Sequence, residues 1–192
     1  DNVGDLEATL SRSGGSSTAT MLAPPGTTDP VDDGSSYRVL EIPTESPNDG
    51  PFSVVTNPAD SFSSPFGWHD DNGVAGPEWM VTRGNNAHAY QDQDDDEAED
   101  FGSSPSGGAG LDFLFTADLT EHAQAYRDAA TTNLFYWNNA FHDILKRYGF
   151  NEAADNFQTI NYGGGPFSNG DYVRAEAADG SGTNNANFST PA

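Results

Sequence analysis

One long amphipathic segment constrains the fold of this chain more than any other feature. Over residues 128–148, large apolar side chains recur at steps of three and four residues, which places them on one face of an α-helix. These side chains are Leu134, Trp137, Phe141, Ile144 or Leu145, and Tyr148. Lys146 and Arg147 suit the negative end of a helix dipole, and Gly149 is a typical C-terminal cap. We therefore expect one long helix over residues 128–148.

Short strand-like runs surround this helix. Before it, runs bounded by Gly, Pro and Asn turns predict strands at residues 37–42, 52–55, 78–82 and 111–115. After it, Asn151 caps a short helix at 152–155, and strands are expected at residues 158–162, 172–177 and 184–188. Short strands at this spacing predict an antiparallel sheet. The expected fold class is α+β, a β-rich lobe packed on one long helix.

The first 36 residues lack the pattern of a packed domain. Val3, Leu6 and Leu10 have the spacing of a short helix, but Gly, Ser, Thr and Pro are abundant over residues 13–34. We interpret residues 1–36 as a linker or the tail of an upstream prosegment, and residues 37–192 as the domain. The start at Asp1 rather than Met predicts a processed product, and no apolar run is long enough to span a membrane.

The charge of the chain excludes several kinds of partner. Thirty acidic residues against seven basic ones give a net charge of −23, which repels phosphate backbones and anionic lipid. We therefore expect no nucleic-acid or membrane partner. The acidic residues predict either a solvated coat suited to concentrated salt or calcium sites, for which Asp92, Asp94 and Asp96 have alternate spacing. A helix–loop–helix calcium loop is excluded, because Glu97 replaces the required glycine and Ser103 the required glutamate.

No catalytic pattern is complete within the chain. The absence of cysteine excludes disulfides, thiolate zinc sites and cysteine nucleophiles. No H-E-x-x-H zinc motif, G-x-S-x-G serine motif or phosphate-binding loop occurs, and the histidines are His69, His88, His122 and His142. His142 lies on the expected long helix. It is either hydrogen-bonded in place as part of the fold or a residue that lines an active site.

Several strings in the sequence are more specific than its composition. They are TNLFYWNN (132–139), HD (142–143), YGFNEA (148–153) and AEAADGSGTNNANF (175–188), preceded by YRV (37–39), SPFGWHD (64–70) and TRGNN (82–86). In this order, over residues 37–192, they resemble the fungalysin family of secreted zinc metalloendopeptidases, which share the thermolysin-like fold. Residues 1–36 carry no such resemblance.

This resemblance implies a two-lobed, secreted, extracellular enzyme that is made as a zymogen with an inhibitory prosegment. The first lobe is β-rich and ends in a substrate-binding edge strand, and the second carries the H-E-x-x-H zinc motif. A peptide substrate adds to that edge strand, where an Asn-Ala pair contacts its backbone. The pair corresponds here to Asn185 and Ala186, with Asn187 and Phe188 after it.

The chain ends at Ala192 without a zinc motif, so we expect that it binds no catalytic zinc and hydrolyses no peptide by itself. In this interpretation its partner is the downstream zinc-binding lobe, and zinc is the cofactor of the complete enzyme. A second hypothesis is a non-catalytic acidic secreted module that binds peptide or calcium. A third is a structural role as the folding partner of another chain.

Overall fold

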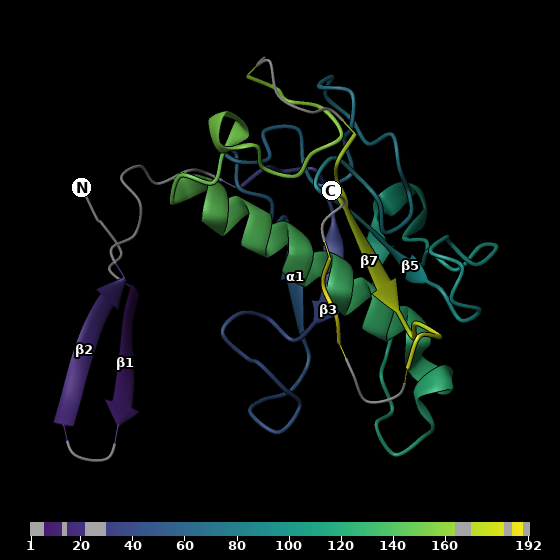
Figure 1. Ribbon diagram of the computed structural model, residues 1–192, viewed down its shortest axis with the longest axis horizontal. Coiled ribbons are helices and arrows are strands. Elements are labelled where there is room, and N and C mark those ends of the chain that lie inside the picture. Colours follow the sequence, from purple (N-terminus) through teal and green to yellow (C-terminus); the bar gives the residue numbers. More distant parts are fainter. Residues whose placement is uncertain (1–5, 13–14, 22–29, 164–169, 183–185, 190–192) are drawn as a thin grey trace.

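The computed structural model describes residues 6–12, 15–21, 30–163, 170–182 and 186–189. One long helix, α1 (Arg127–Arg147), crosses the molecule (Figure 1). Within the described residues, short 3-10 helices are η1 (Gly108–Gly110), η2 (Ala123–Tyr126) and η3 (Glu152–Ala154). The strands are β1 (Leu6–Arg12), β2 (Gly15–Met21), β3 (Ser36–Val39), β4 (Ser53–Thr56), β5 (Ala87–Gln91), β6 (Asp112–Phe113) and β7 (Val173–Ala177). In this part of the chain no helix has the length and apolar character that crossing a membrane requires.

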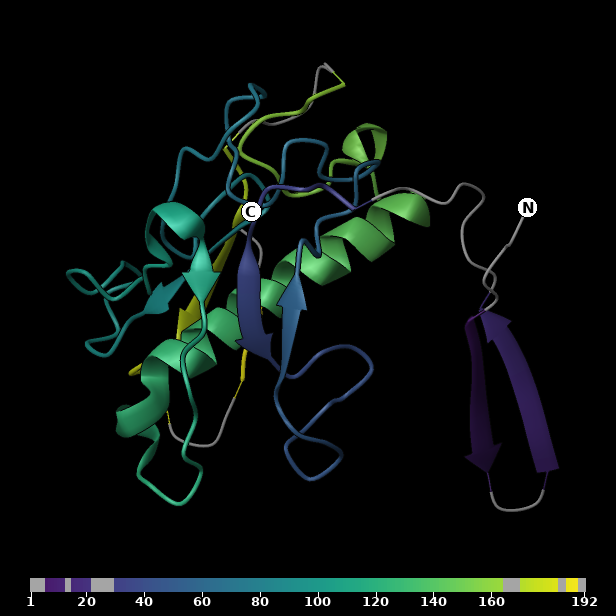
Figure 2. The ribbon, with the colours of Figure 1, turned by 180° about the vertical axis from the view of Figure 1, so that it is seen from behind.

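The strands form small separate sheets. β3 lies between β4, which runs antiparallel to it, and β6, which runs parallel. β5 and β7 form a parallel pair, and α1 packs against β3, β5 and β7, which joins these two sheets (Figure 2). The predicted α+β class is confirmed. The predicted antiparallel arrangement is right for β3 and β4 but wrong for the β3–β6 and β5–β7 pairs.

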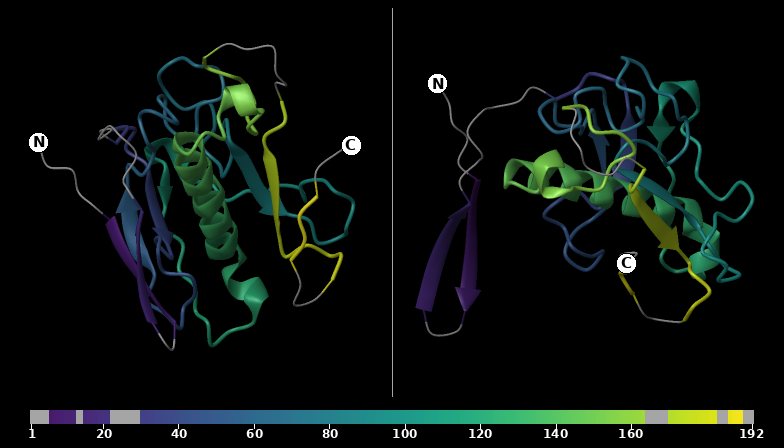
Figure 3. Two further views of the ribbon diagram at one scale, coloured as in Figure 1. Left: turned by 60° about the vertical axis from the view of Figure 1, so that its left-hand side comes forward. Right: turned by 45° about the horizontal axis from the view of Figure 1, so that its top comes forward.

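A hairpin of β1 and β2 lies apart from the rest of the chain (Figures 1 and 3). The short helix expected near Leu6 and Leu10 is wrong, because these residues lie in β1, which pairs antiparallel with β2 from Leu6↔Met21 to Arg12↔Gly15. The Thr- and Ser-rich sequence of β2 favours an extended backbone that can satisfy its hydrogen bonds in such a pair. The interpretation of residues 1–36 as a linker or prosegment tail stays a prediction.

Aromatic rings form the core beneath α1. Tyr37 of β3 stacks on Phe113 of β6 with ring centroids 5.3 Å apart. His69 stacks on Phe113 and on Phe135 of α1, at 5.0 Å in each case. Trp68 meets Phe135 edge-on, and all five side chains are buried. Because large rings bury much apolar area each, a few of them give a core to a chain with only 34% hydrophobic residues.

The ends of α1 lie within one residue of the predicted ends. Gly149 has a φ of +103°, which favours glycine, and its N–H donates to the Lys146 carbonyl at 3.2 Å. The side chain of Asn151 then accepts the N–H of Ala153 at 3.0 Å and caps η3 as predicted. The local signals of helix ends therefore hold in this part of the chain.

Two predicted strands, at residues 78–82 and 158–162, are wrong. Contacts with loop residues replace strand partners in both segments. The Asn85 side chain accepts the N–H of Ile160 at 2.8 Å, and the carboxylate of Asp171 accepts the N–H of Gln158 at 3.1 Å. In the first segment, the backbone N–H groups of Glu78 and Trp79 both donate to the His69 carbonyl, at 3.1 and 3.2 Å, which holds the segment in a loop. Backbone groups satisfied in this way need no strand ladder.

Candidate functional site

The outer edge of β7 is the open edge of its sheet. β7 pairs with β5 along its whole length. The far side of β5 is covered, because the Ala89 N–H donates to the Thr82 carbonyl at 2.8 Å and Arg83 forms a bridge with His88. Within the described ranges, no strand pairs with the outer side of β7. This edge therefore offers backbone groups to an added strand.

A tight turn after β7 reverses the chain. The Gly180 N–H donates to the Asp92 carbonyl at 2.7 Å, and a Cβ at Gly180 would lie 2.4 Å from a backbone oxygen, so only glycine fits. The Asp179 carboxylate accepts the N–H and the hydroxyl of Ser181 at 2.8 and 2.6 Å. Residues 186–189 then run in the direction opposite to β7 (Figure 3).

The predicted substrate-binding residues Ala186, Asn187 and Phe188 lie on this returning segment. All three are exposed, and 73% of the surface of Phe188 is accessible. Asn185 lies outside the described residues. The predicted strand over 184–188 is wrong for 186–188, which have no regular secondary structure, because no strand in the described part of the chain pairs with them. Their role in substrate binding stays a prediction.

His142 is held by both of its ring nitrogens. Nδ1 lies 3.0 Å from an Asp143 carboxylate oxygen, and Nε2 lies 3.2 Å from the side-chain amide nitrogen of Asn156. These contacts fit a donor at Nδ1, which faces a carboxylate, and an acceptor at Nε2, which faces an amide N–H. The structure thus shows His142 hydrogen-bonded within the fold, and its role as an active-site lining residue stays a prediction.

Asp143 is the centre of a polar joint, a cluster of hydrogen bonds between α1 and residues 60–68, which the sequence patterns do not predict. Its buried carboxylate accepts hydrogen bonds from Ser64 Oγ at 2.6 Å, from Trp68 Nε1 at 2.8 Å and from the Asp60 N–H at 3.1 Å, besides the His142 contact. A buried carboxylate is tolerated where such donors surround it. The joint fixes residues 60–68 to α1. In the sequence it could have been recognised from an acidic residue that falls at a buried position of an amphipathic helix.

The TRGNN string (82–86) forms a second joint in the same region. A Cβ on Gly84 would lie 1.6 Å from the Trp68 carbonyl oxygen, so the two backbones touch there. The Asn86 side chain donates to Ser64 Oγ at 3.0 Å and to Asn139 Oδ1 at 3.1 Å. The Arg83 guanidinium lies over the Trp79 ring, 3.8 Å from its centroid. Residues of the strings that carry the family resemblance therefore make contacts between distant parts of the lobe.

Carboxylates gather beside the turn after β7. Two groups have ligand atoms within 4.8 Å of one another, Asp92 with Asp94 and Asp100, and Asp92 with Glu176 and Asp179. Asp96 is in neither group, and its N–H donates to Asp92 at 3.2 Å. The charge of Asp96 raises the pKa of Asp94, and that of Glu176 raises the pKa of Glu97. Mutual repulsion of this kind is relieved by a bound cation or by salt.

These groups do not fit a catalytic zinc. Peptidase zinc is held by histidine together with carboxylate ligands. Within the described residues, both groups consist of carboxylates alone, and none of the histidines joins them. Oxygen-only ligands suit calcium or magnesium instead. The described residues therefore include no group of side chains that suits a catalytic zinc.

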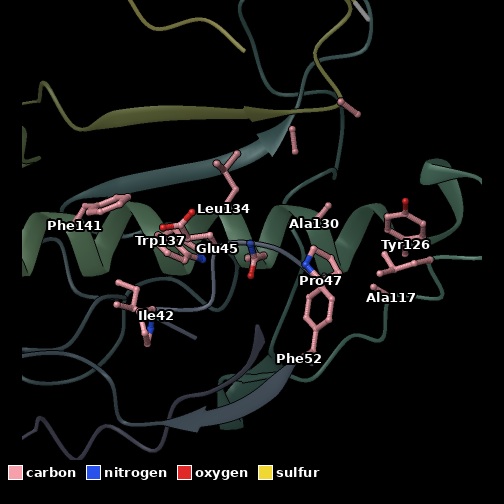
Figure 4. Close-up of a pocket in the computed structure, with 15 residues that line it drawn as sticks. Ile42, Glu45, Pro47, Phe52, Ala117, Tyr126, Ala130, Leu134, Trp137 and Phe141 are labelled. Atoms are coloured by element: carbon pink, nitrogen blue, oxygen red, sulfur yellow. The ribbon is translucent and has the colours of Figure 1, made fainter. Parts of the chain in front are cut away.

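An apolar groove runs along a different face of α1 (Figure 4). We call this cavity of about 950 Å³ the α1 groove. Its floor is formed by side chains of α1, including Ala130, Leu134, Trp137 and Phe141. Its walls come from residues 42–52, from Ala117 and Leu119, and from Ala177 and Ala178 beside the end of β7. The periodicity of the sequence predicts Leu134, Trp137 and Phe141 on the apolar face of the helix but does not indicate that part of that face stays open.

Comparison with known proteins places the chain in a family. The family model described as fungalysin metallopeptidase (M36) matches residues 36–192. The chain belongs to the fungalysin family. It is 41% identical over 168 residues to an extracellular metalloproteinase MEP of Fusarium vanettenii, an alignment that covers 87% of this chain and 26% of that protein. It is 38% identical over 159 residues to extracellular metalloproteinase 2 of Phaeosphaeria nodorum, covering 82% of this chain and 24% of that protein.

The fungalysin match starts at residue 36, one residue before the predicted start of the domain. The resemblance seen in the sequence strings and the expectation of a secreted protein are both confirmed, since these relatives are extracellular. The family is one of metallopeptidases, so a metal belongs to its chemistry. The chain spans about a quarter of the length of the curated relatives that it matches.

Proposed function

We propose that this chain is the substrate-binding lobe of a secreted fungalysin-type zinc metalloendopeptidase that hydrolyses peptide bonds in proteins. The observation that carries the proposal is the open outer edge of β7 in a chain of this family, followed by a segment that returns along it. A peptide in extended conformation adds to such an edge through main-chain hydrogen bonds. Side-chain specificity is then set by pockets elsewhere in the enzyme.

Asn185 and Ala186 hold the substrate backbone in this proposal. An asparagine side chain both donates and accepts, which matches the two polar groups of a peptide unit. The small side chain of Ala186 leaves room for the substrate, and its carbonyl accepts a substrate N–H. Asn187 and Phe188 continue the contact.

Zinc and the catalytic residues belong to the remainder of the enzyme. In this proposal the chain is inactive by itself, which is supported by the all-carboxylate composition of the candidate metal groups among the described residues. Its partners are the downstream zinc-binding lobe, an inhibitory prosegment and protein substrates. Residues 1–36, which lie almost wholly outside the family match, are a linker or the tail of that prosegment.

Replacement of Asn185 by alanine in the complete enzyme tests the substrate role. The loss of hydrogen bonds to the substrate backbone lowers kcat/KM about tenfold, since one such bond is worth on the order of 1–3 kcal/mol when its partner stays buried. Asn184→Ala is the matched control, because successive side chains of a strand face opposite sides. Equal kcat/KM values for the two variants would remove Asn185 from the proposed site.

A second candidate function is an acidic module that binds calcium, which the carboxylate groups around Asp92 favour. Thermal unfolding separates it from a coat adapted to salt. If the acidic surface is a solvated coat, the melting temperature rises with monovalent salt as repulsion is screened, and calcium adds nothing at matched ionic strength. A specific rise with millimolar calcium that Asp92→Asn removes would favour the calcium module.

A further inference from the structure

We propose that the α1 groove is the docking surface for an amphipathic helix from the remainder of the metallopeptidase. The proposal rests on the proposed function, because it assumes that this chain works as one lobe of a larger enzyme. It adds the surface at which the two parts meet and the kind of element that fills it.

The shape of the groove suits a helix. Its floor follows α1 from Ala130 through Leu134 and Trp137 to Phe141, which is one stripe along about three turns, or about 17 Å. Ile42, Glu45, Pro47 and Phe52 lie along α1 beside this stripe (Figure 4), and Ala177 and Ala178 also line the groove. Side chains of a second helix pack into a helical stripe of this kind.

The chemistry of the groove suits an apolar occupant. The indole N–H of Trp137 already donates to the Leu40 carbonyl at 2.9 Å, and the Asn133 side chain accepts the Leu40 N–H at 2.8 Å. These bonds fix the wall of the groove and engage the indole N–H of Trp137 and the side-chain oxygen of Asn133. Among the lining residues one carries a charge, Glu45, which is exposed. The occupant therefore gains mainly by burying apolar surface.

Exposure of large apolar side chains in this groove is costly for a free lobe. Phe141 and Leu119 keep 49% and 50% of their surfaces accessible, in a chain with only 34% hydrophobic residues. Apolar patches of this kind mark interaction surfaces. A second copy of the chain is disfavoured, because two molecules with a net charge of −23 repel each other.

The length of the relatives identifies the occupant as the rest of the enzyme. The alignments cover 24–26% of two extracellular metalloproteinases, so most of such a protein lies outside the segment seen here. Ala177 of β7 lines the groove, which places the docked helix beside the end of the open edge. Docking would then support the strand that holds the substrate.

Thiol labelling tests whether the groove is covered in the complete gene product. The chain has no cysteine, so a single replacement gives a thiol that can be followed by peptide mass mapping. Phe141→Cys places that thiol in the groove. Phe62→Cys is the matched control, since Phe62 is a phenylalanine outside the groove with 58% of its surface accessible. Maleimide labelling rates are compared between the 192-residue chain and the complete protein.

The expected result is that labelling of Phe141→Cys is slower by about tenfold or more in the complete protein, while Phe62→Cys changes by less than about twofold. Equal rates for Phe141→Cys in both proteins would overturn the proposal. Labelling that slows with rising concentration of the 192-residue chain would overturn it in favour of a second copy. Protection without proteolysis would contradict the proposed function alone, and proteolysis without protection would contradict the groove alone.

Discussion

Two faces of α1 differ in polarity and in how far they are covered by other residues. On the face toward residues 60–68, Asp143 accepts hydrogen bonds from three distant groups and from His142, and Arg147 forms an ion pair with Asp60. On the face of the α1 groove, Leu134 and Phe141 form an apolar surface that stays open. On the first face the polar groups of Asp143 and Arg147 have hydrogen-bond or ion-pair partners within this chain. The second is apolar and open among the described residues, and in our proposal another part of the enzyme covers it.

The largest expected effect comes from breaking the polar face. Asp143→Ala leaves buried donors on Ser64, Trp68 and Asp60 without an acceptor, and we expect it to lower the free energy of unfolding by about 4 kcal/mol. Urea denaturation measures the change. Asp128→Ala is the control, because Asp128 is an exposed aspartate in the first turn of the same helix and contributes about 0.5 kcal/mol through the dipole. A loss as small as that of the control would show that the joint is not needed.

Acid should weaken the same region by an intermediate amount. Burial among aromatic rings lowers the pKa of His69 from 6.5 to about 4, and the neutral ring contacts the Tyr37 hydroxyl at 2.7 Å and the Arg83 carbonyl at 3.1 Å. In the unfolded chain His69 is protonated below about pH 6.5, whereas in the folded chain it is protonated only below about pH 4. Stability is therefore full above pH 6.5 and falls between pH 6.5 and pH 4, by up to about 3 kcal/mol from this group.

Urea titrations across this pH window test the role of His69. His69→Phe keeps a stacking ring without a titrating group, so its stability should fall less steeply than that of the unaltered chain. His122→Asn is the control, since His122 is exposed and Asn can also cap η2. An unchanged slope in His69→Phe would mean that other groups cause the acid sensitivity; His88, whose pKa burial also lowers to about 4, would be tested next.

The smallest expected effect comes from changing the open face. Phe141→Asp in the 192-residue chain should alter the free energy of unfolding by less than about 1 kcal/mol, because the side chain is half exposed and its ring contact is with Trp137, 5.3 Å away on the same helix. Leu145→Asp, one turn further along α1 and 45% exposed, is the matched control outside the groove. A much larger loss in Phe141→Asp would mean that this face belongs to the core of the isolated lobe.

The sequence predicted the features that local patterns determine. The ends of α1, the caps at Gly149 and Asn151, and the strands β3, β4, β6 and β7 lie close to their predicted positions. β5 was missed, because its sequence AHAYQ (87–91) leads directly into an acidic run that is typical of a loop. Its five residues are all buried between distant segments, a result of tertiary packing that no local pattern records.

The site was predicted less completely than the fold. The family strings located the returning segment that carries Ala186 to Phe188, but these residues have no regular secondary structure where a strand was expected. The joint at Asp143 joins positions about 80 residues apart in sequence, and the α1 groove exists only when three segments distant in sequence meet the helix. Contacts of this range depend on topology and cannot be derived from periodicity.

The most direct test of the account is proteolysis by the two parts of the enzyme, separate and combined. The 192-residue chain and the remaining metallopeptidase region of the same gene are assayed with zinc on a quenched peptide substrate. We predict that neither part cleaves it alone, that the two combined, or the complete protein, do so, and that a zinc chelator abolishes this activity. Cleavage by the 192-residue chain alone, or a complete gene product that lacks an H-E-x-x-H motif and cleaves nothing, would contradict the account.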